Sequence, residues 1–356
     1  MKRLLLVSAA LLYGLGVAAD DASVVSPKAN PLSTPSLQAP LAAQAVMLSI
    51  AQAGARNIAV GERGIAVYSD DGGKNWQQAS VPVSVTLTGV SFPSSESGWA
   101  IGHAGVVLHS IDGGRSWLKQ IDGVELAKLE LSAAQSSGDE RRVRLAKQLV
   151  SDGPDKPLLA VHFWDEHRGV VLGAYGLIFG TEDGGKSWTS WMGRLENPMG
   201  MHLNAISVNG NRIFIAGEQG LLLRSTDSGA SFELLEPGYN GSWFAVTQSA
   251  EHVVLAGLRG TVYASTDGGD SWSESVVPAP VTILSAVRVP DGRIIYANQA
   301  GQLLSSQNDG KHLQLETRSI GMPLSSLGLG QGGDLLATSF SGVVRLPLSR
   351  QSSVNQ

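Results

Sequence analysis

Short apolar segments alternate with turn residues along most of the chain. In one representative stretch the apolar segments are 87–92, 98–101, 106–109 and 117–120. Apolar runs of this length, bounded by glycine, serine and aspartate, predict β-strands. The same arrangement recurs, so the chain is predicted to consist of units of about 40 residues that each hold four short strands.

An eight-residue motif marks the turn before the fourth strand. It reads hydroxyl residue, any residue, Asp, any residue, Gly, two residues and an aromatic residue. Complete copies occupy 69–76, 110–117, 181–188, 225–232 and 265–272, and a degraded copy at 306–313 has Asn308 in place of Asp. This pattern is an Asp box.

The Asp-box carboxylates are Asp71, Asp112, Asp183, Asp227 and Asp267. An Asp side chain at a tight turn can accept backbone N–H bonds, and the glycines can adopt positive φ. A catalytic acid is needed once, whereas these residues come five times. We therefore predict a structural role for them, and the loop lacks the ligand spacing of a calcium-binding EF-hand.

A pair of glycines, three positions apart, precedes each Asp box. The pairs are Gly61 and Gly64, Gly102 and Gly105, Gly173 and Gly176, Gly217 and Gly220, and Gly257 and Gly260, and the series continues with Gly301 and Gly342. The second glycines number seven and lie about 41 residues apart, apart from one interval of 71. Seven four-stranded units that bury their faces only against their neighbours must close into a ring. The predicted fold is an all-β, seven-bladed β-propeller over residues 43–349.

The two ends of the repeat depart from this pattern. The last unit, 327–348, shows three strands and no Asp box. We predict that a segment before Met47 supplies its missing outer strand and closes the ring. Residues 20–42 contain four prolines and otherwise predict an extended linker, and residues 350–356 form a C-terminal tail.

The long interval between the second and third units has a different composition. Residues 124–134 and 139–150 are rich in Ala, Leu, Glu, Lys and Arg, with a break at 136–138. They predict a helical hairpin inserted at 123–157. Val143, Ala146 and Leu149 would share one helical face. We favour packing of that face on the propeller rim, and a partner contact is the alternative.

Residues 1–19 predict an export signal, with Lys2 and Arg3 before an apolar run and small residues at 17–19. The run is too short to span a bilayer comfortably. The expected compartment is the periplasm, or the thylakoid lumen in a photosynthetic host. The chain has no cysteine, and its net charge is −5 with both signs interspersed, which argues against nucleic acid as a partner. We expect a monomer without metal or cofactor.

The glycine turns join strands two and three of each unit, so they lie on the face opposite the Asp boxes, together with the connections between units. The middle residues of these turns vary, as expected of a composite recognition surface or of neutral surface drift. The candidate binding residues are Glu62, Arg63, His103, Tyr175, Glu218, Gln219, Arg259 and Gln299. Further candidates on this face are Asn197, Met201, His202, Asn204, Tyr239, Asn240 and Trp243, the last also a core candidate. His162 and Arg288 occupy matching innermost positions, where they could line a central channel.

Two groups of residues carry a family resemblance: 87–92 with 98–102, and 173–176 with 183–185. Together with the predicted export signal and the seven repeats, they make the chain resemble the photosystem II stability and assembly factor family of plastids and cyanobacteria. The resemblance covers 44–348 except the insertion. It implies a seven-bladed propeller that acts as an assembly chaperone and not as an enzyme. In a non-photosynthetic host it implies a periplasmic accessory to a membrane protein complex or transporter.

A glycoside hydrolase is the alternative, because Asp boxes also occur in sialidases. A sialidase needs three arginines, a Tyr–Glu pair and an acid, and a retaining hydrolase needs two carboxyl groups about 5 Å apart. Only Arg63, Arg259 and Arg288 are expected near the mouth, and 287–290 only faintly resembles the sialidase motif. Glu62, Glu218 and Tyr175 leave hydrolysis open. A carbohydrate- or lipid-binding module is a third option.

Overall fold

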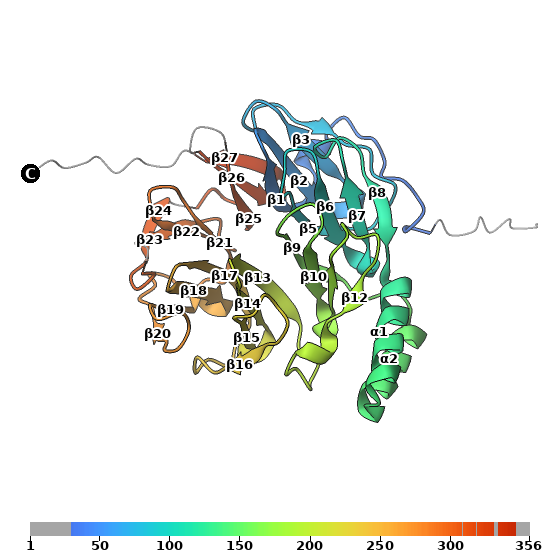
Figure 1. Ribbon diagram of the computed structural model, residues 1–356. Coiled ribbons are helices and arrows are strands. Elements are labelled where there is room, and N and C mark those ends of the chain that lie inside the picture. Colours follow the sequence, from blue (N-terminus) through green and yellow to red (C-terminus); the bar gives the residue numbers. More distant parts are fainter. Residues whose placement is uncertain (1–29, 308, 318, 331–333, 347–356) are drawn as a thin grey trace, which may run out of the picture.

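The computed structural model describes residues 30–307, 309–317, 319–330 and 334–346 (Figure 1). Within these residues the strands form six four-stranded sheets and one three-stranded sheet, all antiparallel. The first strands of successive sheets contact one another in chain order, and the last of them contacts the first. The closed ring confirms the predicted seven-bladed propeller.

Blades one to four follow the chain from the centre outward. Blade one contains β1 (Met47–Ala53), β2 (Arg56–Gly61), β3 (Ala66–Ser69) and β4 (Gln77–Gln78). Blade two contains β5 (Leu87–Ser91), β6 (Gly98–Gly102), β7 (Val107–Ser110) and β8 (Leu118–Ile121). Blade three contains β9 (Leu158–Phe163), β10 (Gly169–Gly173), β11 (Ile178–Thr181) and β12 (Thr189–Ser190). Blade four contains β13 (Leu203–Asn209), β14 (Arg212–Gly217), β15 (Leu222–Ser225) and β16 (Glu233–Leu235).

The remaining three blades complete the ring. Blade five contains β17 (Trp243–Ser249), β18 (His252–Gly257), β19 (Val262–Ser265) and β20 (Ser273–Glu274). Blade six contains β21 (Ile283–Arg288), β22 (Ile294–Asn298), β23 (Leu303–Ser306) and β24 (Gln314–Thr317). Blade seven contains β25 (Leu324–Leu329), β26 (Leu335–Ser339) and β27 (Gly342–Leu346).

The second strand of each blade is buried on both faces because blades pack against neighbours on either side. In β6 every residue is buried, and its Trp99 is 0% exposed. The Trp99 ring stacks on Phe163 of blade three with 3.6 Å between ring centroids, and its Nε1 donates to Gln120 Oε1 at 3.0 Å. Such side chains join one blade to the next.

The glycine turns are held between the two connections that flank each blade. In blade one, a Cβ on Gly61 would lie 1.9 Å from Val46 O, and a Cβ on Gly64 would lie 2.1 Å from Val83 O. Gly64 also has φ +74°, in the region that favours glycine. The backbone N–H of Glu62 donates to Val46 O at 3.0 Å. The repeated glycines therefore reflect close backbone packing.

The predicted ring-closing strand is wrong for the described residues. Within 30–46 no strand pairs with β27. This segment runs beside blade one instead, where Ser36 N donates to Val81 O and Ser84 N donates to Pro31 O. The prolines at 31, 35 and 40 offer no N–H to a strand ladder, which agrees with this irregular course.

The two ends of the ring nevertheless meet. The 3-10 turn Ala42–Gln44 contacts β27, and a Cβ on Gly342 would lie 2.1 Å from Ala43 O, the same packing that Gly64 has with Val83. Ser325 Oγ of blade seven donates to Met47 O of blade one at 2.7 Å. The segment before β1 thus takes the place of a connection between blades.

The predicted helical hairpin is confirmed, with α1 at Gly123–Ser137 and α2 at Glu140–Asp152. Asp122 and Glu125 form a capping box at the start of α1, and Gly138 ends it with φ +73°. The hairpin lies at the outer edge of the ring (Figure 1). Its Leu126 and Leu149 pack into the core between blades two and three, so the apolar face of the hairpin contacts the rim.

Within the described residues, neither helix is long and apolar enough to cross a membrane. The predicted export signal (1–19), the start of the linker (20–29), the last propeller positions (347–349) and the tail (350–356) lie outside the described residues.

Candidate binding face

One face of the ring carries the glycine turns together with the connections between blades. We call it the turn face. Five of its turns are short 3-10 segments, at Glu62–Gly64, His103–Gly105, Ala174–Gly176, Glu218–Gly220 and Leu258–Gly260. The Asp boxes follow the opposite ends of the third strands, and so they lie on the other face.

Most of the predicted binding residues project from the turn face. The exposed ones are Arg63, His103, Tyr175, Gln219, Arg259 and Gln299, whereas Glu62 and Glu218 are half-buried. The middle residue of each of these five 3-10 segments has positive φ although it is not glycine. These residues are Arg63 (51°), Ala104 (58°), Tyr175 (58°), Gln219 (52°) and Arg259 (58°). This backbone costs a side-chain-bearing residue roughly 1 kcal/mol. The rigid turns hold these side chains at fixed places on the rim.

Glu62 and Glu218 have partners within the protein. Glu62 Oε1 accepts a hydrogen bond from Val46 N at 3.0 Å. Glu218 Oε2 accepts one from His202 N at 3.0 Å, and its other oxygen lies 3.3 Å from His202 Nδ1. Both carboxylates therefore fix the connection that enters their own blade.

Tyr175 forms a partly exposed aromatic cluster between blades three and four. Its side chain is 55% exposed, and its ring lies 5.1 Å from that of His202. Lys156 Nζ, which pairs with Asp152 at 3.0 Å, lies 5.1 Å from the centre of the Tyr175 ring. A tyrosine held in this way is suited to anchor a partner.

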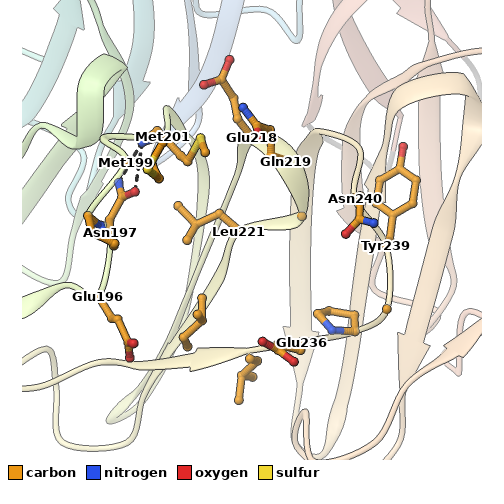
Figure 2. A pocket seen from close by; sticks show the side chains of 16 residues that line it. Glu196, Asn197, Met199, Met201, Glu218, Gln219, Leu221, Glu236, Tyr239 and Asn240 are labelled. Carbon is orange, nitrogen blue, oxygen red and sulfur yellow. Dashed lines mark hydrogen bonds between the residues drawn. The ribbon is translucent and has the colours of Figure 1, made fainter.

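The turn face holds a pocket of about 400 Å³ over blade four. Its walls are the connections on either side of that blade, and its inner residues include Leu221 and Leu235. Three glutamates line it, Glu196, Glu218 and Glu236, together with the exposed Met199. In Figure 2 Glu196 and Glu236 lie on one side and Glu218 on the opposite side. No Lys or Arg occurs among its sixteen described lining residues.

The pocket brings together several residues that sequence reasoning had placed on this face. They are Asn197, Met201, Glu218, Gln219, Tyr239 and Asn240. The remaining candidates on the turns belong to other blades. Trp243 is 0% exposed in the core, and its ring lies 4.5 Å from that of Tyr239 in a tilted arrangement. Asn204 donates to Trp243 O at 2.9 Å, a contact between blades four and five.

Sequence reasoning missed Glu196, Met199 and Glu236. One signal could have found the first two. The connection 191–202 between blades three and four is longer than its counterpart at 79–86, and a longer connection can swing away from the ring and leave a hollow.

His162 and Arg288 lie on the innermost strands β9 and β21, as their pattern predicts, with side chains largely withdrawn from solvent. The His162 ring packs edge-on against Trp164, 5.0 Å away. Arg288 Nη2 donates to His252 O of blade five at 3.3 Å. Burial lowers the pKa of the Arg288 guanidinium and lowers that of His162 to about 4.

His162 should make folding stability depend on pH. Its pKa falls from 6.5 to about 4 on folding, so the unfolded chain binds this proton more readily. Its contribution to the free energy of unfolding is therefore fully present above pH 6.5 and is lost as the pH falls towards 4. At pH 5 we expect a loss of about 2 kcal/mol relative to pH 8, measured by urea unfolding.

The His162→Gln variant is the control for this prediction, since it should lose less stability over the same interval. The Asp-box carboxylates titrate below it, because Asp183 and Asp227 have pKa values of about 2. Equal losses in variant and wild type would contradict a role for His162.

The five Asp-box carboxylates accept hydrogen bonds from the same positions of their turns, with Asn75 Nδ2 in the first copy taking the place of the serine Oγ found in the other four. In the third copy, Asp183 Oδ1 accepts from Thr181 Oγ1 at 2.9 Å and from Ser187 N at 2.9 Å, and Oδ2 accepts from Ser187 Oγ at 2.6 Å. The hydrogen bonds from Ser187 are the main cause of the low pKa of Asp183. Both oxygens are thus engaged within the turn. In the described part of the chain, no cluster of three or more His, Asp or Glu side chains is placed to hold a metal ion.

Comparison with known proteins gives matches in sequence. A family model described as "Photosynthesis system II assembly factor YCF48" matches residues 32–126 and 140–354. Photosystem II assembly lipoprotein Ycf48 of Synechococcus sp. (strain CC9902) is 29% identical over 195 residues, which cover 53% of this chain and 58% of the relative. The chloroplastic photosystem II stability/assembly factor HCF136 of Oryza sativa subsp. japonica is 26% identical over 50% of this chain and 51% of its own length. The chain thus spans less than two thirds of these two relatives.

Solved structures match the fold more fully. One described as "YCF48 bound to D1 peptide" has a TM-score of 0.66 at 16% identity and covers 89% of this chain and 100% of that chain. The WD40 β-propeller domain of Doa1 has a TM-score of 0.63 at 12% identity, over 90% of this chain and 97% of that domain. At these identities the likeness shows the propeller fold alone. Between residues 32 and 354, the family match leaves out only 127–139, which is much of α1 and the tip of the hairpin.

Proposed function

Because this chain belongs to the photosystem II assembly factor family, we propose that it is an exported, non-catalytic binding protein that assists assembly of a membrane protein complex. The family match, which spans all seven blades, is the observation that carries this proposal. The predicted export signal supports the compartment. The client is proposed to be a membrane protein or a subunit of a membrane complex.

We place the client site on the turn face. The related structure is described as holding a peptide, so a propeller of this kind can present a peptide-binding surface. In this chain, Arg63, Tyr175 and Arg259 project from rigid turns and are exposed. Because the turns already hold their shape, binding would order few additional residues, which favours affinity.

Hydrolysis is less well supported by the same face. The two candidate acids, Glu62 and Glu218, lie on blades one and four and accept hydrogen bonds from backbone N–H groups. Arg288 donates to the backbone of blade five. These three side chains bind backbone groups of the protein, whereas a hydrolase needs two carboxyl groups facing one substrate.

Crosslinking in the intact cell envelope, followed by recovery of the exported protein, tests the proposal. The variant Arg63→Ala/Tyr175→Ala/Arg259→Ala removes three exposed side chains from the turn face. We expect the wild type to recover a membrane protein and the variant to recover at least tenfold less, since exposed aromatic and arginine anchors dominate such interfaces.

The matched control is Lys74→Ala/Ile111→Ala/Lys186→Ala, which removes two cations and one apolar side chain from exposed positions of the Asp boxes on the opposite face. It should recover the client as the wild type does. If the wild type recovers no protein partner, the assembly function is abandoned, and glycans are screened for binding and hydrolysis.

A further inference from the structure

The pocket over blade four lies where two departures from the blade repeat meet. One is the long connection 191–202, and the other is the helical hairpin. Glu130 of α1 is 2% exposed. It pairs with Arg142 of α2 at 2.8 Å and accepts a hydrogen bond from Ser190 Oγ, just before the connection.

Further contacts hold the connection itself. Arg141 Nη2 at the start of α2 donates to Pro198 O at 2.8 Å, and Arg194 Nη1 donates to Gly229 O of blade four at 2.8 Å. The Arg194 guanidinium also lies 4.3 Å from the centre of the Trp191 ring. These contacts hold Pro198 and its neighbour Met199 as a wall of the pocket. The shape of the pocket is therefore fixed by side-chain contacts with the connection 191–202.

The charged side chains that line the pocket favour a cationic ligand. Glu196 and Glu236 are exposed, lie on the same side of the pocket and make no ion pair among the described residues (Figure 2). Met199, 74% exposed, lines the same hollow. Carboxylates without a cationic neighbour in the lining would attract a cationic group and repel an anionic one.

We propose that this pocket binds an extended segment of the client in which a lysine or arginine stands beside an apolar side chain. The inference rests on the proposed function and deepens it. The cation would lie between Glu196 and Glu236, and the apolar side chain would contact Met199, whose flexible thioether adapts to different shapes. The exposed amide of Asn240 is placed to pair with the peptide backbone.

The size of the pocket agrees with a short segment. A volume of about 400 Å³ lies near the lower end of ligand sites, roughly 300–1,000 Å³. It accommodates a few side chains and not a folded domain. The surrounding turn face would contact the rest of the client.

Fluorescence anisotropy with labelled seven-residue peptides tests the inference. The probes are Gly-Ser-Leu-Lys-Leu-Ser-Gly and its counterpart with Glu in place of Lys. We expect the full-length protein to bind the Lys peptide at least tenfold more tightly. The variant Glu196→Gln/Glu236→Gln should lose about fivefold in affinity for that peptide, and 500 mM NaCl should weaken the wild type in the same direction.

Two further variants distinguish binding in this pocket from non-specific electrostatic attraction of the Lys peptide to the protein surface. Glu96→Gln/Glu274→Gln removes the same charge from exposed positions on blades two and five and should bind as the wild type does. Met199→Ser should weaken both peptides and keep the preference for lysine. No preference for lysine in the wild type, or equal losses in both glutamine pairs, would overturn the inference.

The crosslinking experiment separates this inference from the proposed function. If the wild type and the Glu196→Gln/Glu236→Gln variant recover a client equally, and the Lys peptide is not preferred, the pocket inference fails and the assembly function stands. If the wild type recovers no client, the assembly function fails whatever the peptides show.

Discussion

Replacing Trp99 with alanine is expected to lower the free energy of unfolding by about 4 kcal/mol, as for other large buried aromatic side chains. Trp99 is 0% exposed and stacks on Phe163 of blade three and on His109 within blade two. Alanine would leave a cavity between two blades that their strand ladders hold rigid. Urea unfolding followed by circular dichroism measures the loss.

Trp99→Phe serves as the conservative control. It keeps an aromatic ring beside Phe163 but removes the hydrogen bond from Nε1 to Gln120 Oε1, so it should cost about 1–2 kcal/mol. Gln120 also donates to Gly184 O in the Asp box of blade three at 2.8 Å. If alanine and phenylalanine cost the same, packing between blades two and three contributes little beyond the hydrogen bond.

Replacing Gly64 with alanine is expected to cost about 3 kcal/mol, from a left-handed backbone that disfavours a side chain and from steric overlap. The added Cβ would lie 2.1 Å from Val83 O. Because Val83 belongs to the connection that leads into blade two, relief of the overlap requires that connection to move. The melting temperature and the urea midpoint should both fall.

Gly138→Ala is a matched control. Gly138 has φ +73°, against +74° for Gly64, but nothing lies within 4 Å of its added Cβ. Only the backbone preference is lost there, so we expect about 1 kcal/mol. Similar losses in the two variants would show that the overlap with Val83 is unimportant.

The blade repeat was predictable from the sequence because each of its signals has a local physical cause. Gly61 and Gly64 leave room for the backbone of neighbouring connections, and so glycine recurs wherever a blade is made. The Asp box is likewise complete within eight residues, since its carboxylate binds groups of the same turn. Such signals do not depend on distant parts of the chain.

The pocket was not predictable in the same way. Its wall at 196–199 takes its course from contacts with the hairpin, such as that of Arg141 with Pro198 O, and these residues are 57 positions apart. The variable turn residues suggested an exposed surface, but Glu218 also holds the backbone N–H of His202. Only the folded chain shows which of these side chains remain available.

The seam between blades seven and one sets the order in which the protein can be completed. Ser325 Oγ donates to Met47 O across 278 positions of the chain. No described strand of the N-terminal segment pairs with a strand of blade seven. Because synthesis begins at the N-terminus, one side of blade one therefore stays uncovered until nearly the whole propeller has been made. Contacts between such distant residues form slowly. The last event of folding should be the docking of blade seven against blade one. Until then the open ring exposes one apolar face on each of these two blades, and such faces favour association with other chains.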